Sequence, residues 1–537
     1  MSRFFNALPV NRVVLFALIL ILAPSGAVHA ASGQATDPGT VVHLVINARA
    51  PGRPFPHFWE RMFGSGRAAL VLRANYQRDL GIMRTDTDIA YVRFHGVLDR
   101  GVGLVESNPA LFYNKPSSKH SPYNFSYIDQ IYDALLAHGV RPFVELDFMP
   151  KALAANPRMR QSFWYHPIVS PPRSYAAWDR MIRALARHVI SRYGIDEVSR
   201  WYFEVWNEPN LDFWGGAPRR QSYFELYDHT ARALKEVDPR LRVGGPATAQ
   251  AAWVPAFLAH TWKDRVPVDF VSTHVYGDDS AHDVLHIDEP IPRSDMVCRA
   301  VDAVHRQIEA SPYPRLPLIL SEYNASYKNL PNVTDSVYMG PWLANTIRQC
   351  AGKVEMMSYW AFSDVFEEQG VVKSPFYGGF GLIAEDRIPK PAFNAFAMLH
   401  RLGHTRLPVD SDQVLATRRE DGSVVLALWN YAAPVGTTAT YTVGEPAGVD
   451  QQFVVDVAHL AGADHATVWR LDRRHGDVIT AFDAMGRPAF PSRAQIRALR
   501  QAARPAAPQP LAMHDGTFRV DIPPQGLVVV ELGTGSG

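Results

Sequence analysis

Short apolar runs alternate with longer segments in which apolar residues recur every three to four positions, from about residue 57 to residue 403. The short runs are rich in β-branched and aromatic residues and predict strands, whereas the longer periodicity predicts amphipathic helices. Eight strand-like runs occur: 57–66, 91–95, 142–146, 201–208, 242–245, 270–276, 318–323 and 355–362. The helical segments between them include 125–138, 175–193, 223–237, 296–309 and 338–349.

This alternation of strand and helix predicts an α/β fold with a parallel sheet. Eight strands, each followed by a helix, close naturally into a (β/α)8 TIM barrel. The structural rival is a doubly wound open sheet, which more often carries a glycine-rich phosphate loop after its first strand, and the sequence has none there. We therefore expect a (β/α)8 barrel over residues 57–403.

The pattern changes after residue 404. Strand-like runs punctuated by glycine and proline occur at 414–416, 424–428, 438–441, 453–457 and 527–530, which predicts an all-β sandwich domain at 404–537 that packs against the barrel. Residues 501–510 are rich in alanine and proline and predict a loop. An alternating run at 41–46 lies in the N-terminal segment 31–56 and is expected to join the sandwich.

The first thirty residues have the pattern of a signal peptide. Arg3 and Arg12 give a positive start, residues 13–22 are apolar, and Val28-His29-Ala30 presents small side chains at the selective positions. Cleavage near Ala30 would export the protein to the periplasm or the medium. The alternative, a membrane anchor, needs more apolar residues to cross roughly 30 Å of hydrocarbon, so no membrane association is expected after cleavage.

The charge balance and the cysteine content limit which binding partners and which metal sites can be expected. The 54 basic and 53 acidic residues nearly cancel, which gives no basis for binding nucleic acid or an anionic membrane and favours a neutral partner. Cys298 and Cys350 are the only cysteines, so a disulfide scaffold and a four-cysteine zinc site are excluded. Both fall in helical patterns, and the sequence leaves open whether they pair or remain buried thiols.

Two glutamates follow apolar strands. Glu208 lies in Trp206-Asn207-Glu208-Pro209-Asn210 at the end of the fourth strand, and Glu322 lies near the end of the seventh. Reactive side chains of a parallel barrel sit where the strands end, so these two carboxyl groups are expected to meet. Cleavage of a glycosidic bond needs such a pair, one to protonate the leaving oxygen and one to stabilise or attack the anomeric carbon.

Five stretches in this order resemble glycoside hydrolase family 39, and within it the β-xylosidase branch of the retaining barrel glycosidases: 91–96, 142–146, 206–211, 321–327 and 359–368. The resemblance covers essentially the whole chain after Ala30. It implies that Glu208 is the acid/base and Glu322 the nucleophile, with their carboxyl groups roughly 5–5.5 Å apart. Glu208 must start protonated, so we expect burial and the charge of Glu322 to raise its pKa.

The resemblance also implies a set of side chains that bind the sugar. An aromatic face such as Trp360 can stack on the C–H surface of a sugar, while amide, imidazole and carboxylate groups bind its hydroxyls. The expected residues are His95, Asn207, His274, Tyr276, Trp360 and Glu368, with Glu367 as an alternative to Glu368. Glu145 and Glu204 lie inside strands and are interpreted as structural ion partners. No His-Glu-x-x-His helix occurs, and neither a metal nor a cofactor is expected.

The sequence therefore predicts an exo-acting β-xylosidase that releases xylose from the non-reducing ends of xylo-oligosaccharides during xylan degradation. Alternatives with the same chemistry are an α-L-iduronidase-like enzyme, which must bind a uronate carboxylate, an α-L-arabinosidase and an endo-acting enzyme on an exopolysaccharide. An alternative from another class is a non-catalytic carbohydrate-binding protein, although both glutamates are present. The absence of a Gly-x-Ser-x-Gly motif disfavours a serine hydrolase. No pattern in the sequence indicates the oligomeric state.

Overall fold

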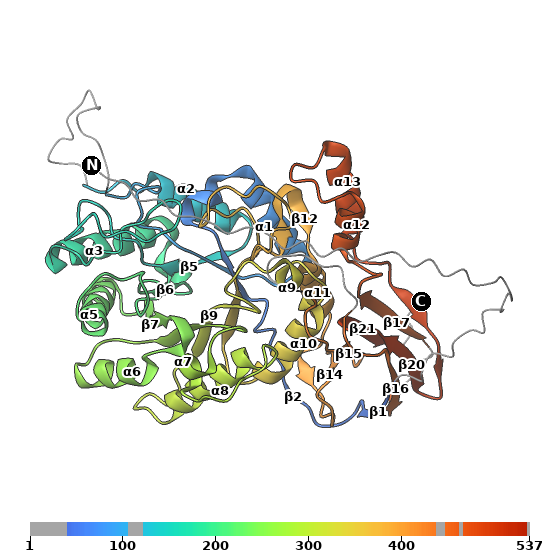
Figure 1. The fold of residues 1–537 in the computed structure, drawn as a ribbon. Helices are drawn as coiled ribbons and strands as arrows, with labels where there is room; N and C mark the ends of the chain where they lie inside the picture. Colours follow the sequence, from blue (N-terminus) through green and yellow to red (C-terminus); the bar gives the residue numbers. More distant parts are fainter. Residues whose placement is uncertain (1–39, 106–121, 437–445, 461–464, 534–537) are drawn as a thin grey trace, which may run out of the picture. The chain divides into compact units, whose positions relative to one another are not determined.

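The computed structural model describes residues 40–105, 122–436, 446–460 and 465–533. The predicted signal peptide at 1–30 and the strand predicted at 438–441 lie outside the described residues. Within the described part of the chain, no helix combines the length and the apolar character needed to cross a membrane. The predicted fold class is confirmed, because a closed parallel barrel is followed by β-sheets that form a separate domain (Figure 1).

Eight parallel strands form the barrel, and each lies within or overlaps one of the eight runs predicted from the sequence. Hydrogen bonding follows chain order around the barrel and closes between the last strand and the first. The strands are β3 (Met62–Ser65), β4 (Tyr91–Phe94), β5 (Arg141–Glu145), β6 (Tyr202–Glu204), β7 (Arg242–Thr248), β8 (Phe270–Tyr276), β9 (Leu318–Asn324) and β10 (Met356–Tyr359).

Helices surround the barrel (Figure 1). In α3 (Tyr175–Tyr193), Ser174 caps the first turn and Gly194 ends the helix at a φ of 81°. The predicted bounds of α3 and α8 are confirmed. The other helices of this region are α1 (Ala74–Asp86), α2 (Ser126–Ala137), α4 (Ile195–Val198), α5 (Arg219–Val237), α6 (Val254–Lys263), α7 (Ala281–Leu285), α8 (Met296–Glu309), α9 (Pro331–Thr334), α10 (Met339–Cys350) and α11 (Pro391–Leu399).

Large apolar side chains fill the barrel interior near the amino ends of the strands. Seven of the eight strands each contribute one residue to this layer: Met62, Tyr91, Phe143, Tyr202, Phe270, Ile319 and Met356. The eighth strand, β7, contributes Gly244, where a Cβ atom would stand 2.5 Å from the Phe270 ring. The interior of the barrel is thus filled with apolar groups near the amino ends of the strands, and its polar side chains lie nearer the carboxyl ends.

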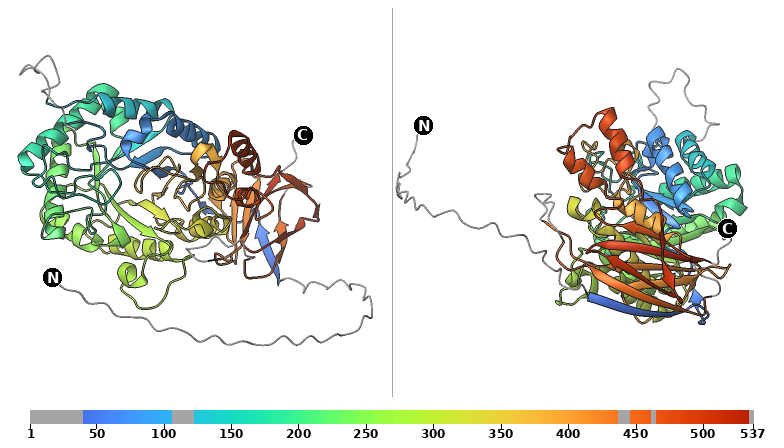
Figure 2. Two further views of the ribbon diagram at one scale, coloured as in Figure 1. Left: turned by 45° about the horizontal axis from the view of Figure 1, so that its top comes forward. Right: turned by 90° about the vertical axis from the view of Figure 1, so that its right-hand side faces the viewer.

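Two sheets form the sandwich, and the N-terminal segment supplies a strand to each. The first sheet has the order β1-β16-β20-β19 and the second β18-β17-β21-β15-β14-β13-β2. Strand β1 runs parallel to β16 and lies beside it in both views of Figure 2, although the two are far apart in the sequence. The strands are β1 (Thr40–Asn47), β2 (Arg53–Pro54), β13 (Thr405–Arg406), β14 (Val414–Arg418), β15 (Val424–Asn430), β16 (Gln451–Ala458), β17 (His465–Leu471), β18 (Gln509–Leu511), β19 (Met513–His514), β20 (Thr517–Ile522) and β21 (Gly526–Gly533).

The sequence reasoning expected a C-terminal region made only of β-strands, and this prediction is wrong. The region also holds α12 (Val478–Ala484) and α13 (Arg493–Ala502), and the predicted loop at 501–510 shrinks to the residues between Ala502 and Gln509. Ser492 and Gln495 form a reciprocal capping box at the start of α13. This Ser-x-x-Gln spacing is visible in the sequence and predicts the beginning of a helix.

The larger sheet of the sandwich packs against barrel helices. Gly340 of α10 lies so close to β17 and β21 that an added Cβ atom would stand 3.1 Å from Leu471 and 3.2 Å from Leu527. At the C-terminal end of α10, Cys350 forms a disulfide with Cys298 of α8, which resolves the alternative that the sequence leaves open. The barrel and the sandwich therefore share one continuous apolar core through α10 and α11.

Candidate active site

A cavity of about 390 Å³ lies among side chains that end or follow the barrel strands. His95 follows β4, Glu208 follows β6, Glu322 lies near the end of β9 and Trp360 follows β10. Because the strands are parallel, these positions meet at the C-terminal face, where barrel enzymes carry their active sites. Seven of the nine residues singled out from the sequence line this cavity: His95, Asn207, Glu208, Tyr276, Glu322, Trp360 and Glu368.

The two glutamates come together in this cavity. A carboxylate oxygen of Glu208 and one of Glu322 lie within 4.8 Å of each other, and a ring nitrogen of His274 lies within the same distance of both. Exposure is 13% for the Glu208 side chain and 5% for that of Glu322. An approach this close between one oxygen of each group favours the roughly 5–5.5 Å arrangement, in which one member attacks directly, over the roughly 6.5–9.5 Å arrangement that holds a water between them.

The chain leaves the barrel ladder before it reaches Glu208. Strand β6 ends at Glu204, four residues earlier than the sequence predicts. The reason is a turn, because Trp206 and Glu208 take positive φ angles of 71° and 40°, which an extended strand does not allow. The Glu208 N–H donates to the Ala247 carbonyl at 2.8 Å, so the turned segment stays attached to β7.

Both carboxylate oxygens of Glu322 have a fixed donor. The Arg93 guanidinium donates through Nη1 to Oε1 at 2.6 Å, and the Tyr276 hydroxyl donates to Oε2 at 2.7 Å. Charge-assisted hydrogen bonds of this length hold a carboxylate in one orientation. Glu322 is therefore positioned before any substrate arrives, and Tyr276 reaches it from the neighbouring strand β8.

Arg93 is the functional residue that the sequence reasoning missed. Its side chain is fully buried, and besides Glu322 it contacts Glu204 through Nε at 2.6 Å and Glu145 through Nη2 at 2.8 Å. Nη2 also donates to the Asn207 side-chain oxygen at 3.0 Å. The interpretation of Glu145 and Glu204 as ion partners is confirmed. The sequence did contain an indication of the cation that they share, because Arg93 is the single charged residue in the apolar run 91–94.

Burial raises the pKa of Glu208 to about 7, the nearby charge of Glu145 adds to the shift, and the cations of His95 and Arg93 oppose it. The expected direction of the shift is confirmed, and burial is its main cause as expected. The carboxylate that contributes to the shift is Glu145, whereas the sequence reasoning named Glu322. Glu208 is thus largely protonated below pH 7, as a proton donor must be.

His95 is held as a cation at the edge of the cavity. Its Nδ1 donates to Glu145 at 2.8 Å, and its Nε2 lies 3.5 Å from Glu368 and 3.8 Å from Glu322. Burial disfavours the charged ring, but these three carboxylates hold the pKa of His95 well above its usual value. The imidazolium can therefore donate a hydrogen bond to a ligand hydroxyl from Nε2.

The structure separates the two candidate acids that the sequence leaves as alternatives. Glu368 lines the cavity, and burial raises its pKa although His95 opposes this. Glu367 is turned the other way, where Arg67 donates to its Oε2 from Nε at 3.0 Å and Arg73 binds its Oε1. Glu367 does not reach the cavity; its pairing with the two arginines fixes the loop that carries Glu368.

Trp360 and His274 are the remaining two of the residues that the sequence predicts to bind the sugar. Trp360 lines the cavity and packs over Gly64 of β3, where a Cβ atom would stand only 2.1 Å from the indole. Gly64 is required there because no side chain leaves room for the ring.

His274 does not line the cavity, although its Nδ1 lies 3.1 Å from Glu208. Burial lowers the pKa of His274 to about 4. His274 is therefore a neutral neighbour of Glu208.

Among the described residues, three groups of side chains bring metal-type ligand atoms within 4.8 Å of one another: His57, Glu60, Asp88 and His400; His95, Glu145 and Asp147; and Glu208, His274 and Glu322. Each carboxylate at the centre of a group already has donors. Arg93 and Tyr276 bind Glu322, Gly96 donates to Asp147, and His57 and His400 contact Glu60. We therefore assign all three as hydrogen-bonded clusters.

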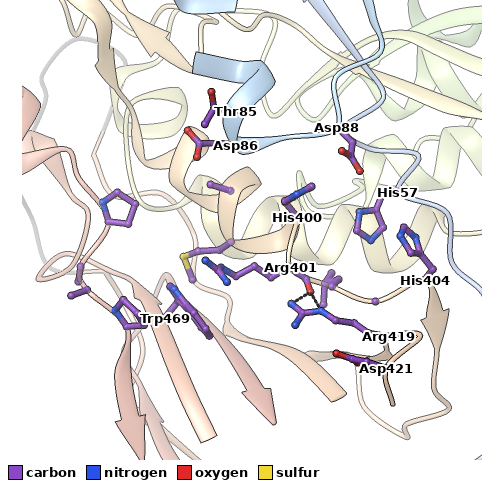
Figure 3. A pocket seen from close by; sticks show the side chains of 18 of the residues that line it. His57, Thr85, Asp86, Asp88, His400, Arg401, His404, Arg419, Asp421 and Trp469 are labelled. Atoms are coloured by element: carbon purple, nitrogen blue, oxygen red, sulfur yellow. Dashed lines mark hydrogen bonds between the residues drawn. The ribbon is translucent and has the colours of Figure 1, made fainter. Parts of the chain in front are cut away.

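A second cavity, of about 1100 Å³, lies between the barrel and the sandwich (Figure 3). His57 and Asp88 on its wall precede strands β3 and β4, so this cavity is at the amino ends of the barrel strands. On the sandwich side, Arg419 donates to the Arg401 carbonyl at 2.6 Å, a contact drawn in Figure 3. Barrel enzymes place catalysis at the opposite face, so the smaller cavity is the candidate active site.

Comparison with known proteins finds a family model and relatives that match most of the chain. The family model described as "Glycosyl hydrolases family 39" matches residues 42–518. A protein named β-xylosidase from Geobacillus stearothermophilus is 38% identical over 490 residues, which is 89% of this chain and 93% of the relative. A second protein of that name, from Caldicellulosiruptor saccharolyticus, is 34% identical over 83% of this chain and 88% of the relative.

A solved structure is similar over nearly the same length. The crystal structure of a monomeric β-xylosidase from Caulobacter crescentus CB15 has a TM-score of 0.81 and 34% sequence identity. The match covers 91% of this chain and 99% of that one. The likeness therefore extends over both the barrel and the sandwich.

We expect Arg93→Met to lower the free energy of unfolding by about 3–5 kcal/mol, because it leaves several buried carboxylates without a cation. Urea denaturation followed by tryptophan fluorescence measures this change. Arg61→Met is the matched control, because Arg61 pairs with Glu355 on the surface, where such a pair contributes at most about 1 kcal/mol. Equal, small effects of the two substitutions would contradict the role assigned to Arg93.

Proposed function

The chain belongs to family 39 of the glycosyl hydrolases, and from this premise we propose that it is a retaining, exo-acting β-xylosidase. In this proposal it releases xylose from the non-reducing ends of xylo-oligosaccharides, with Glu208 as acid/base and Glu322 as nucleophile. The proposal rests on one observation: in a single cavity, a carboxylate oxygen of Glu208 lies within 4.8 Å of a carboxylate oxygen of Glu322.

In the first step, the Glu208 carboxyl group gives its proton to the glycosidic oxygen while Glu322 attacks the anomeric carbon. The bond from that carbon to the leaving oxygen breaks, and a bond to a Glu322 oxygen forms. The raised pKa of Glu208 supplies the proton at a pH near neutral. The donors on Glu322 keep its attacking oxygen aimed at the cavity.

In the second step, Glu208 is a carboxylate and takes a proton from a water molecule, which attacks the same carbon and displaces Glu322. Two inversions give net retention of configuration, and both glutamates return to their starting states. His95 and Glu368, which line the same cavity, are placed to hold hydroxyl groups of the sugar during both steps.

The charges of the cavity wall favour a neutral sugar over a uronate. Among the described residues that line the cavity, none is a lysine or an arginine, while Glu208, Asp279, Glu322 and Glu368 are acidic. A uronate carboxylate would find only the His95 cation in this lining, because the Arg93 guanidinium is already paired with Glu145, Glu204 and Glu322. This argues against the iduronidase alternative. The small cavity volume, near the low end of roughly 300–1,000 Å³ for ligand pockets, supports exo action.

A panel of nitrophenyl glycosides tests the function. We expect rapid release of chromophore from the β-xyloside, weak or no release from the α-L-arabinoside, and none from the α-L-iduronide. Glu322→Ala should abolish release because the covalent intermediate cannot form.

The matched control is Glu355→Ala, which removes a surface carboxylate 44% exposed. Azide identifies the two roles: with Glu208→Ala it should yield the β-xylosyl azide, and with Glu322→Ala the α-anomer. Release from no glycoside in the panel would leave a non-catalytic carbohydrate-binding protein as the alternative.

The titration of Glu208 sets the basic limb of the pH profile. The acid form is present below the pKa of about 7 and is lost above it, so kcat/KM on xylobiose should fall about tenfold per pH unit above pH 7. Initial rates between pH 4 and 9 measure this limb. An activated nitrophenyl leaving group needs little protonation, and its profile should be flatter. An unchanged basic limb in Glu208→Gln would show that another group titrates.

We also propose that the protein is exported and cleaved after Ala30. The basic residues, the apolar run 13–22 and the Val28-His29-Ala30 ending support this. The pairing of Cys298 with Cys350 also supports it, because stable disulfides are typical of oxidising compartments. Mass spectrometry of the protein from the periplasm or medium of an expressing bacterium should find Ala31 as the first residue. An intact N-terminus in the cytoplasmic fraction would contradict the proposal.

A further inference from the structure

We propose that a cavity of about 500 Å³, separate from the candidate active site, binds a sugar acid, which is a ligand with one oxyanion and several hydroxyl groups. Four arginines line this cavity: Arg73, Arg78, Arg387 and Arg500. None of its lining residues lines the candidate active site. The proposal goes beyond the proposed function and does not depend on it.

The cavity is formed where the start of α1 meets the C-terminal region. The first two arginines stand at the start of α1, Arg387 belongs to the short helix η4 (Glu385–Arg387), and Arg500 belongs to α13. Helix α1 contacts η4, and α13 contacts β12 (Ile388–Pro389), which directly follows η4 (Figure 1). Three separate segments of the chain therefore bring the four guanidinium groups to one cavity.

These arginines keep N–H groups for a ligand. Arg78 and Arg387 are exposed and form no salt bridge or side-chain hydrogen bond within the described part of the chain. Arg73 binds Glu367 through Nη2, and Arg500 donates to the Asp386 carbonyl, from Nε at 2.7 Å and from Nη2. A guanidinium has five N–H donors and binds a carboxylate or a phosphate with two of them at once.

The N-terminus of α1 adds to the positive potential of the cavity. Ala74 and Asn75, in the first turn of this 13-residue helix, line the cavity. The N-cap residue, Arg73, makes no capping hydrogen bond with its side chain, and the first turn has no acidic residue. Such a helix end favours an anion. The negative group of the ligand is therefore expected between this end of α1 and the guanidinium groups.

A buried carboxyl group on the same wall has an oxygen that lacks a partner. Asp79 lines the cavity although it is only 1% exposed. Its Oδ2 accepts from the Ser363 hydroxyl at 2.6 Å, whereas its Oδ1 has no hydrogen-bond partner among the described residues. Buried polar atoms are almost always hydrogen-bonded. A hydroxyl group of a ligand would supply this hydrogen bond. Burial also raises the pKa of Asp79 to about 7, which reduces its negative charge near neutral pH.

The acidic residues of the wall favour a sugar acid over a bare inorganic anion. Glu385 and Asp386 line the cavity together with Asp79, and charged carboxylates repel a sulfate or a phosphate. On a sugar acid, the same carboxylates accept from the hydroxyl groups while the arginines bind the oxyanion. The cavity volume lies within the roughly 300–1,000 Å³ of ligand pockets. This cavity thus selects an anionic sugar, whereas the candidate active site selects a neutral one.

Isothermal titration calorimetry of the whole protein at constant ionic strength tests the proposal. The probes are glucuronate, glucose 6-phosphate, glucose and sulfate. We expect at least one sugar acid to bind about tenfold more tightly than glucose, which lacks the anion, and than sulfate, which lacks the hydroxyl groups. One hydrogen bond to a charged group is enough for such a factor. The stronger of the two sugar acids identifies the oxyanion as a carboxylate or a phosphate.

A double variant, Arg78→Gln with Arg387→Gln, places the binding in this cavity. It should weaken the binding of the preferred sugar acid about tenfold or more, because both arginines without partners are lost. Arg73 stays unchanged because it also holds Glu367, next to Glu368 of the candidate active site. The matched control is Arg187→Gln with Arg493→Gln, which removes the same charge from two exposed positions outside the cavity.

Three results would overturn the proposal. They are binding of glucose as tight as that of both sugar acids, binding of sulfate as tight as theirs, and an equal loss of affinity in the double variant and its control. Circular dichroism shows whether each variant is folded, and exposed arginines are not expected to affect folding. The titration measures binding without turnover, so a failure of the proposed function would leave its result unchanged.

Discussion

The Arg93 guanidinium, buried among Glu145, Glu204 and Glu322 and bonded to Asn207, is the interaction on which the rest of the site depends. Without it, the carboxylates of β5, β6 and β9 would repel one another, and these groups and the Asn207 amide would lose their hydration without compensation. With it, they form a layer above the apolar floor of the barrel. Glu322 is oriented by this layer directly, and His95 indirectly through Glu145.

The same cation separates the roles of the two glutamates. Arg93 contacts Glu322 at 2.6 Å, whereas Glu208 has no arginine or lysine partner within the described part of the chain and lies beside the neutral ring of His274. Burial without a paired cation favours the protonated carboxyl group. Glu322 is thus suited to attack and Glu208 to give a proton, although an oxygen of one carboxyl group lies within 4.8 Å of an oxygen of the other.

The strands and the two glutamates were predictable because they depend on local pattern. Alternating short and periodic runs mark βαβ units, and an acid that follows an apolar strand stands out. The end of β6 was not predictable, because it depends on the φ angle of Trp206, which no propensity indicates. The distinction between Glu367 and Glu368 depends on Arg67 and Arg73, which are distant in the sequence. The pairing of Cys298 with Cys350 likewise needs the packing of α8 on α10.

The parallel pairing of β1 with β16 bears on the order in which the molecule can fold. A ribosome completes Thr40–Asn47 long before it reaches Gln451, the first residue that pairs with this strand. During synthesis the barrel can therefore assemble while β1 still has an open hydrogen-bonding edge, and long-range pairings of this kind close slowly. The first strand of the described chain to be made is thus among the last to find its partner, and its open edge depends on protection until the chain is finished.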